Sequence, residues 1–258
     1  MSIYNGKHFL GKSIKSVLNQ TYTNYEFIII DDASKDNSLE LINSYALKDN
    51  RIKVIKNKVN IGLTKSLNKG ISIAQGEFIV RQDGDDFFLP NHLEKLLYFF
   101  NNNPEYAFCG VNGFTIQNKK DLLNFFEFND IRKNLLIRNC FNHSGIIVRK
   151  NIFEKYGKYD ETYRYGQDYE LWCRLIYKYG LKGANLKDRL IIRNMPVERF
   201  FNKNIPKFII QRVNSIRTKF RYLKHSQYQL KSILSIFIRI IEILTLSHLM
   251  EKFSKLLS

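Results

Sequence analysis

Short apolar runs alternate with helical patterns through the first part of the chain, and this order constrains the fold most. Apolar runs at 25–30, 52–55 and 78–80 alternate with helical spacings at 9–18, 39–46, 63–74 and 92–102. A short apolar run bounded by turn residues is typical of a strand that is buried on both faces. Strands that alternate with helices indicate βαβ units, so we predict an α/β protein with a mostly parallel sheet flanked by helices.

Two groups of acids directly follow two of these predicted strands. They are Asp31 with Asp32, and Asp83 with Asp85 and Asp86. Ligands of open α/β sheets bind beyond the carboxyl ends of the strands, so both groups should lie at one edge. Neighbouring carboxylates repel and raise each other's pKa. A hard cation such as Mg²⁺ or Mn²⁺ would hold them ionised and would bind substrate phosphates. We therefore expect a nucleotide diphosphate here; a solvated acidic turn is the alternative.

Composition excludes several classes of protein. The 258 residues are 44% hydrophobic and 25% charged, as in an ordinary globular protein. No apolar run is long enough to span a membrane, and the first residues do not resemble a signal peptide. Cys109, Cys140 and Cys173 are far apart, so neither a zinc site nor a disulfide framework is indicated. We expect a cytoplasmic protein with reduced thiols.

The second half is less regular and ends in a basic tail. Strands are predicted at 106–111 and 145–148, and a helix at 167–179. We expect one domain over 1–200, followed by a helical tail at 201–258. The chain has a net charge of +17, and the tail carries +9 of it. A basic tail predicts an anionic partner.

The tail segment 229–255 reads as one helix with an unusual pattern. Ser235, Arg239, Glu242 and Thr245 form a narrow polar stripe, and apolar residues cover the rest. Two charges near the middle disfavour a membrane span. A broad apolar face close to Lys231, Lys252 and Lys255 favours an interfacial helix on anionic lipid. The alternative is a helix that docks on the catalytic domain or on a second subunit.

Several motifs, in order, resemble the family 2 glycosyltransferases of the bacterial surface-glycan type. The resemblance runs from Ser2 to about Leu190 and rests on Tyr4-Asn5, 16–22, 29–34, 60–63, 67–70, 76–77, 83–86, 143–144 and 166–172. It implies a GT-A (Rossmann-like) fold and an inverting transfer from a nucleotide-sugar donor. It also implies that 1–200 is a catalytic domain, with a nucleotide-sugar half at 1–105 and an acceptor half at 106–200.

The resemblance also implies roles on the nucleotide side. Tyr4, Asp31 and Asp32 would surround the base, since a carboxylate suits the N–H edge of uracil or guanine. Asn60 and Gly62 would lie along the nucleotide; a plain turn before a helix is the alternative reading.

For the acidic cluster, the resemblance implies a D-x-D pair. Asp83 would lie near the ribose and the metal, and Asp85 would bind the cation that bridges the diphosphate. Asp86 would support them.

On the acceptor side, Asp168 resembles the catalytic base; a helix N-cap is the alternative. The family commonly has an acid before it, where this chain has Gln167, and losing that charge would lower the pKa of the base. His143 could contact substrate or phosphate, or could be structural. Trp172 would pack in the core or line the acceptor cleft.

Two departures from the family pattern stand out. Met1 lies only three residues before Tyr4, so the first, normally central strand appears truncated, and we expect exposed strand edges or a gap in the core. The chain could be a fragment, or its start could be assigned too late. In addition, the segment Arg193, Asn194, Met195 and Pro196 lacks the His that the family often carries there.

The expected function is therefore an inverting glycosyltransferase. It would move a sugar, from a UDP-sugar in our reading, to a hydroxyl of a cell-surface glycan or a lipid-linked acceptor, on the inner face of the cell membrane. An inactive or fragmentary remnant is one alternative, and a metal-dependent nucleotidyltransferase is another. A nucleic-acid binder is disfavoured because the candidate cleft is acidic.

Overall fold

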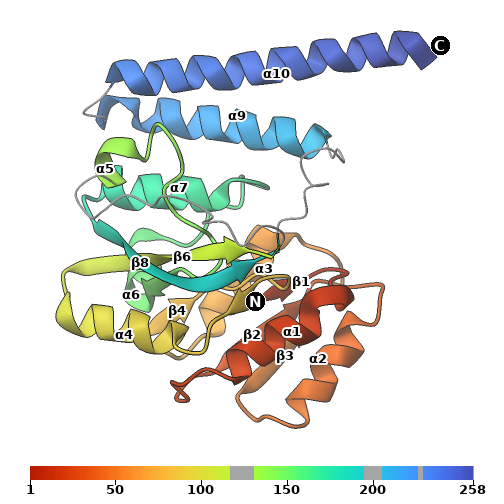
Figure 1. Ribbon diagram of the computed structural model, residues 1–258, viewed down its shortest axis with the longest axis vertical. Helices are drawn as coiled ribbons and strands as arrows, with labels where there is room; N and C mark the ends of the chain where they lie inside the picture. Colours follow the sequence, from red (N-terminus) through yellow and green to blue (C-terminus); the bar gives the residue numbers. More distant parts are fainter. Residues whose placement is uncertain (117–130, 195–204, 226–228, 258) are drawn as a thin grey trace.

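The computed structural model describes residues 1–116, 131–194, 205–225 and 229–257 (Figure 1). The first half alternates strands and helices as predicted: β1 Ser2–Ile3, α1 Lys7–Leu18, β2 Phe27–Asp31, α2 Ser38–Ala46, β3 Ile52–Lys56, α3 Leu63–Ile73 and β4 Phe78–Val80. Strands β1, β2 and β3 form a parallel sheet in that order. The apolar runs therefore become neighbouring parallel strands.

A second, mixed sheet follows. It has the order β4-β7-β6-β8-β5 and consists of β4, β5 Phe87–Phe88, β6 Tyr106–Thr115, β7 Ile147–Arg149 and β8 Lys182–Arg193. Only β6 and β8 pair in parallel. The sequence did not predict β8, and register shifts along its pairing with β6 explain why. Such irregularities interrupt the alternation of side chains by which a strand is recognised.

Helices cover both sheets. They are α4 His92–Asn102, α5 Ile131–Asn134, α6 Lys150–Tyr156 and α7 Gln167–Cys173, the last of which continues as a π-helical turn, η1 Arg174–Lys178. One apolar core includes Leu10, Ile29 and Leu96, all fully buried. A second core includes Phe108 and Trp172, also fully buried.

The first strand is as short as expected, and a groove lies beside it. Strand β1 pairs with β2 only at Ile30 and Asp31, and β4 is an edge strand of the second sheet. Between these edges lies a cavity of about 1040 Å³, whose lining includes Ile28, Phe78 and Val80. The amino group of Met1 donates to the carbonyl oxygen of Ile28 at 2.9 Å. Burial, with a contribution from Arg81, lowers the pKa of that amino group to about 5.

The tail forms a helical hairpin on the second sheet's side of the molecule. Helix α9 Ile205–Tyr222 is followed by a short 3₁₀ turn, η2 Leu223–His225, and by α10 Gln229–Leu257. In Figure 1, α9 lies over α7, and α10 lies over α9 as the outermost layer. Within the described residues, no helix is both long and apolar enough to cross a membrane.

Candidate active site

Two loops at the carboxyl ends of β1 and β2 form one wall of the candidate site. The backbone N–H of Asn5 donates to Oγ of Ser34 at 3.0 Å, and the N–H of Lys35 donates to Oδ1 of Asn5 at 2.8 Å. Asn5 and Ala33 both have positive φ, of 52° and 61°. Non-glycine residues in this region cluster at functional sites. Tyr4 is 48% exposed on this wall, so its ring is accessible to a nucleotide base.

The neighbouring acids Asp31 and Asp32 have different partners. The carboxylate of Asp32 accepts hydrogen bonds from Nδ2 of Asn57 at 2.8 Å and from the backbone N–H groups of Ile61 at 3.0 Å and Gly62 at 2.8 Å. It thereby holds the loop that carries Asn60, which is exposed. Asp31 accepts one bond at Oδ2, from the N–H of Ser34, and its buried Oδ1 has no hydrogen-bond partner among the described residues. Of the two carboxylates, only that of Asp31 has an oxygen, Oδ1, to which no described residue donates a hydrogen bond.

Asp83 is held ionised by a buried arginine. Nη2 of Arg81 lies 2.6 Å from Oδ1 of Asp83, and Arg81 is only 5% exposed. Burial alone would raise the pKa of Asp83, but the positive charges of Arg81 and then Arg193 lower it to about 2. The backbone of this turn is fixed by Ser144, whose Oγ accepts from the N–H of Asp83 at 3.1 Å.

Asp86 is buried and has other partners. Its Oδ1 accepts from the backbone N–H of Asn194 at 3.1 Å, and Nε of Arg193 lies 3.4 Å from its Oδ2. Burial and the nearby Asp83 raise the pKa of Asp86 to about 6, although Arg193 opposes the rise. Asp85, between them, is half-buried. The three acids of the turn therefore differ in burial and in partners.

The donor set of this turn fits a hard divalent cation that brings its own oxygen ligands. No ready-made group of three ligating side chains occurs among the residues that the structure describes. Mg²⁺ is commonly bound by one or two carboxylates and completes its shell with water and substrate phosphates. Asp83 and Asp85, both partly exposed, offer that number, whereas Asp86 is buried.

Asp168 lies in the first turn of α7. Its Oδ2 accepts from Nδ2 of Asn139 at 3.1 Å, and the backbone N–H of Phe141 in turn holds Oδ1 of Asn139 at 3.1 Å. Burial raises the pKa of Asp168, against the N–H of Tyr169 and Asn139, which lower it. The raised pKa of Asp168 shows that burial has a larger effect than the replacement of the family's neighbouring acid by Gln167. Gln167 is itself buried. A carboxylate with a raised pKa is a better proton acceptor.

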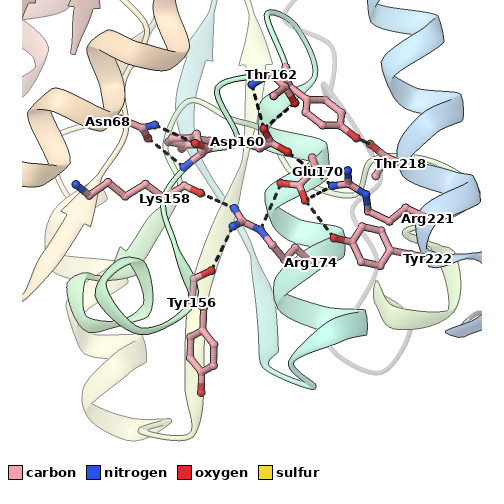
Figure 2. A network of polar contacts seen from close by, with 12 residues as sticks. Asn68, Tyr156, Lys158, Asp160, Thr162, Glu170, Arg174, Thr218, Arg221 and Tyr222 are labelled. Atoms are coloured by element: carbon pink, nitrogen blue, oxygen red, sulfur yellow. Dashed lines mark hydrogen bonds and ion pairs between the residues drawn. The ribbon is translucent and has the colours of Figure 1, made fainter.

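A polar network around Glu170 anchors α7 (Figure 2). Glu170 is 1% exposed, and its carboxylate lies 3.4 Å from Nε of Arg174 and 3.4 Å from Nη1 of Arg221. The hydroxyl of Tyr222 donates to it at 3.1 Å. Arg174 donates to the backbone carbonyl oxygens of Tyr156 and Lys158. The network ties the helix of Asp168 to α6 and α9.

Helix α3 contacts the segment that precedes α7. Oγ1 of Thr64 donates to the carbonyl oxygen of Tyr163 at 2.9 Å. Asn68 exchanges two hydrogen bonds with the backbone of Tyr159, at 2.9 and 3.0 Å. The segment so held ends at Gly166, whose positive φ of 75° turns the chain into α7.

His143 and Trp172 occupy different environments. The ring Nε2 of His143 is 2.9 Å from the hydroxyl of Tyr159. Burial, with Arg81 nearby, lowers the pKa of His143 well below its ordinary value, so the ring is neutral at pH 7. Trp172 is fully buried and stacks on Phe108, with 4.9 Å between ring centroids. Trp172 was expected either in the core or in the acceptor cleft, and the structure places it in the core.

Comparison with known proteins identifies the family. A family model described as "Glycosyl transferase family 2" matches residues 1–157. This chain belongs to glycosyltransferase family 2. It is 35% identical over 198 residues to "Putative glycosyltransferase EpsE" of Bacillus subtilis (strain 168), a match that covers 74% of this chain and 69% of the relative.

A second relative has a more specific name. The chain is 29% identical over 186 residues to "UDP-Glc:alpha-D-GlcNAc-diphosphoundecaprenol beta-1,3-glucosyltransferase WfgD" of Escherichia coli, which covers 72% of this chain and 71% of the relative. The chain spans 57%, 69% and 79% of the lengths of three curated relatives that it matches at 30% identity or more.

A solved structure confirms the GT-A fold that the family resemblance implied. The mannosyltransferase PcManGT of Pyrobaculum calidifontis, in complex with GDP-Man and Mn²⁺, superposes with a TM-score of 0.70 at 13% sequence identity. The match covers 92% of this chain and 67% of that one.

Sequence reasoning on this family 2 chain missed three polar residues of the site. Arg81 and Asn139 lie beside acids that the sequence did identify, and Arg193 pairs with Asp86 at the end of β8. The one available signal was Arg81, a cation directly between an apolar strand and an acidic cluster. Arg193 supplies a positive charge in the segment that lacks the family's His, while Met195 and Pro196 lie outside the described residues.

Proposed function

We propose that this chain is an inverting glycosyltransferase that moves a sugar from a UDP-sugar to a hydroxyl of a surface-glycan acceptor. The observation that carries the proposal is the pairing of Asp168, a carboxylate whose pKa is raised by burial, with an acidic turn in which Asp83 stays ionised. Arg81 acts electrostatically on both of these carboxylates. The candidate proton acceptor and the candidate diphosphate-binding turn are therefore influenced by the same buried cation.

In this mechanism Asp168 takes the proton of the acceptor hydroxyl as the hydroxyl oxygen bonds to the anomeric carbon of the donor. The bond from that carbon to the diphosphate oxygen breaks in the same in-line step, so the configuration inverts. Asn139 orients the carboxylate of Asp168. Arg81 and Arg193 place positive charge near the departing diphosphate.

On the donor side, Tyr4 would stack on the base and the unused oxygen of Asp31 would accept an N–H from its edge. Asp32 would act indirectly, by holding the loop of Asn60 and Gly62 against the nucleotide. Asp85 and Asp83 would hold Mg²⁺ or Mn²⁺, which stabilises the charge that develops on the leaving nucleotide.

The acceptor and the place of action are part of the same proposal. WfgD, by its name, uses UDP-Glc and an acceptor linked to diphosphoundecaprenol. We propose a lipid-linked or growing surface glycan as the acceptor here, which would place the enzyme in the cytoplasm at the inner face of the cell membrane. His143 and Gln167 would contribute to the acceptor or phosphate side.

The test is nucleotide binding by calorimetry and by thermal shift, with UDP, GDP and their sugars, in Mn²⁺, Mg²⁺ or EDTA. We expect UDP to bind and to raise the melting temperature only with metal. Asp85→Asn should weaken metal-dependent binding by about two orders of magnitude, while the matched surface variant Asp188→Asn binds as the parent.

Two outcomes would contradict the proposal. Preferential binding of GDP would overturn the assigned donor; the complex of PcManGT makes this the main competitor. Failure of every nucleotide diphosphate to bind with either metal would identify an inactive remnant. The anomeric configuration of the transferred sugar, read by NMR, tests inversion.

A further inference from the structure

Helix α10 packs Ser235 of its polar stripe on the protein, next to buried Ile236, and leaves most of its described apolar residues exposed. Ser235 is buried, and its Oγ donates to the carbonyl oxygen of Leu136 at 3.2 Å. Nζ of Lys219, on α9, donates to the same Oγ at 2.8 Å. An ordinary surface helix buries its apolar side instead.

The charged residues of the stripe form ion pairs beside this interface. The carboxylate of Glu242 lies 2.7 Å from Arg239 and 2.7 Å from Arg212 of α9. Glu242 is therefore paired with arginines within the tail and contributes little negative charge to the outer face.

The outer face of α10 is broad and apolar. Its residues follow spacings of four and three, with exposures of 57% to 81%: Leu230, Leu234, Phe237, Ile241 and Leu244. Ile233 and Ile238, 36% and 48% exposed, widen the stripe on either side. At the rotation of an α-helix these seven positions cover an arc of roughly 140°, wider than the narrow seam of a two-stranded coiled coil.

Charge distinguishes the two partners that could cover this face, which are a second copy of the chain and an anionic lipid surface. The tail carries +9, and Lys231 is exposed on α10 next to the outer face. A second copy of the chain would bring its own net +17 against the first, which like-charge repulsion opposes. An anionic lipid surface complements the charge and accepts the apolar face.

We propose that the outer face of α10 binds the surface of an anionic lipid bilayer, with the helix lying in the interface plane. This proposal rests on the proposed function in one respect: membrane binding would bring the enzyme to a lipid-linked acceptor. The outward face lies on the far side of α9 from α7 and Asp168, so the membrane would contact the tail rather than the base itself (Figure 1).

The test uses the full chain, without donor or acceptor, so its result is independent of glycosyl transfer. Co-sedimentation is measured with vesicles of phosphatidylcholine alone and of phosphatidylcholine mixed with phosphatidylglycerol, across a salt series. We expect binding to the acidic vesicles to exceed binding to neutral ones by about tenfold and to weaken as salt rises. The triple variant Leu234→Gln, Phe237→Gln, Ile241→Gln should lose about tenfold or more.

The matched control removes exposed apolar side chains elsewhere: Leu47→Gln with Tyr98→Gln, which are 89% and 69% exposed. It should bind as the parent does. A second readout is Phe237→Trp, whose emission should shift to the blue on acidic vesicles; the native Trp172 is buried and gives a constant background. Equal binding by the triple variant and the parent would overturn the proposal. So would a salt-resistant dimer that the triple variant dissociates, because a second copy would then occupy the face.

Discussion

Nη2 of Arg81 lies 2.6 Å from Oδ1 of Asp83, two residues further along the same turn. The pair is formed by a cation that is almost fully buried and an acid that is 31% exposed. Arg81 therefore fixes the charge of the acidic turn from behind and leaves the carboxylate open to a ligand in front. The same arginine acts on His143 and Asp168, so one buried charge influences both the donor side and the acceptor side.

Asp168→Asn should separate chemistry from donor binding. The amide keeps the hydrogen-bonding shape of the side chain but cannot accept the acceptor's proton, so we expect transfer to fall by about 10² to 10⁴. Donor affinity, measured by calorimetry, should stay within a factor of about two. The surface variant Asp188→Asn, whose parent side chain is 40% exposed, is the control. Near-normal turnover of Asp168→Asn would remove Asp168 as the base.

Asn139→Ala should shift the pH dependence of transfer. Asn139 donates to the ionised carboxylate of Asp168 and lowers its pKa, so the variant should have a higher pKa at Asp168. The acidic limb of the pH–rate profile should move to higher pH, while the rate on the alkaline side of that limb stays close to the parent's. A variant that was slower by the same factor at every pH would show a structural role instead.

Lys219→Met should change how stability depends on pH. Nζ of Lys219 is buried and donates to the carbonyl oxygen of Ile137 at 3.0 Å. Burial, and after it Arg239, lowers the pKa of Lys219 to about 8. Because the folded pKa lies below the unfolded value of 10.5, the folded chain releases this proton first and stability should rise from about pH 8 to 10.5.

The methionine variant should lack this contribution, which amounts to about 3 kcal/mol between pH 7 and full deprotonation. The measurement is the difference in free energy of unfolding between parent and variant, by urea titration from pH 7 to 10. Lys224→Met, at an exposed site, is the control. A parent–variant difference that does not change with pH would mean that Lys219 titrates normally.

Filling the groove beside β1 should stabilise the protein. An extension of about five to seven Val- and Ile-rich residues before Met1 would pair with the free edges of β2 and β4 and replace the buried amino group with a peptide. Each buried apolar side chain contributes roughly 1.5 to 3 kcal/mol, against an ordering cost of about 1 to 2 kcal/mol per residue.

We therefore expect a rise of several degrees in melting temperature, at about 2 to 4 °C per kcal/mol for a domain of this size. Affinity for UDP should rise as well, because Tyr4 would follow a longer strand. An extension of the same length made of Gly and Ser is the control. Equal melting of both extensions would mean that the groove does not accept a strand.

How much of this could be read from the sequence depends on whether an interaction is local. The strands before Asp31 and Asp83 were predictable because an apolar run and its acids are contiguous. The other elements and contacts depend on interactions between residues that are far apart in the sequence. Strand β8 was missed because its register shifts relative to β6. The direction of the polar stripe of α10 depends on Arg212, which lies on another helix.

The same distinction applies within the site. Asp31 and Asp32 are equivalent in sequence, yet only the fold shows that Asp32 is engaged by the loop before α3. Asn139 had no signal at all, since it meets Asp168 from 29 residues away. The buried environment that raises the pKa of Asp168 is likewise a property of packing.

Gly84 separates the two acids of the candidate metal turn, and its Cα faces the side chain of Ile3 in β1. A Cβ at position 84 would clash with Cδ1 of Ile3. The glycine is therefore explained by the strand packed on it as well as by the acids on either side. Positions 3 and 84 should covary among relatives, with a larger residue at 84 accompanied by a smaller one at 3. A change of the spacer in the acidic turn would therefore require the side chain at position 3 of the first strand to move or to change.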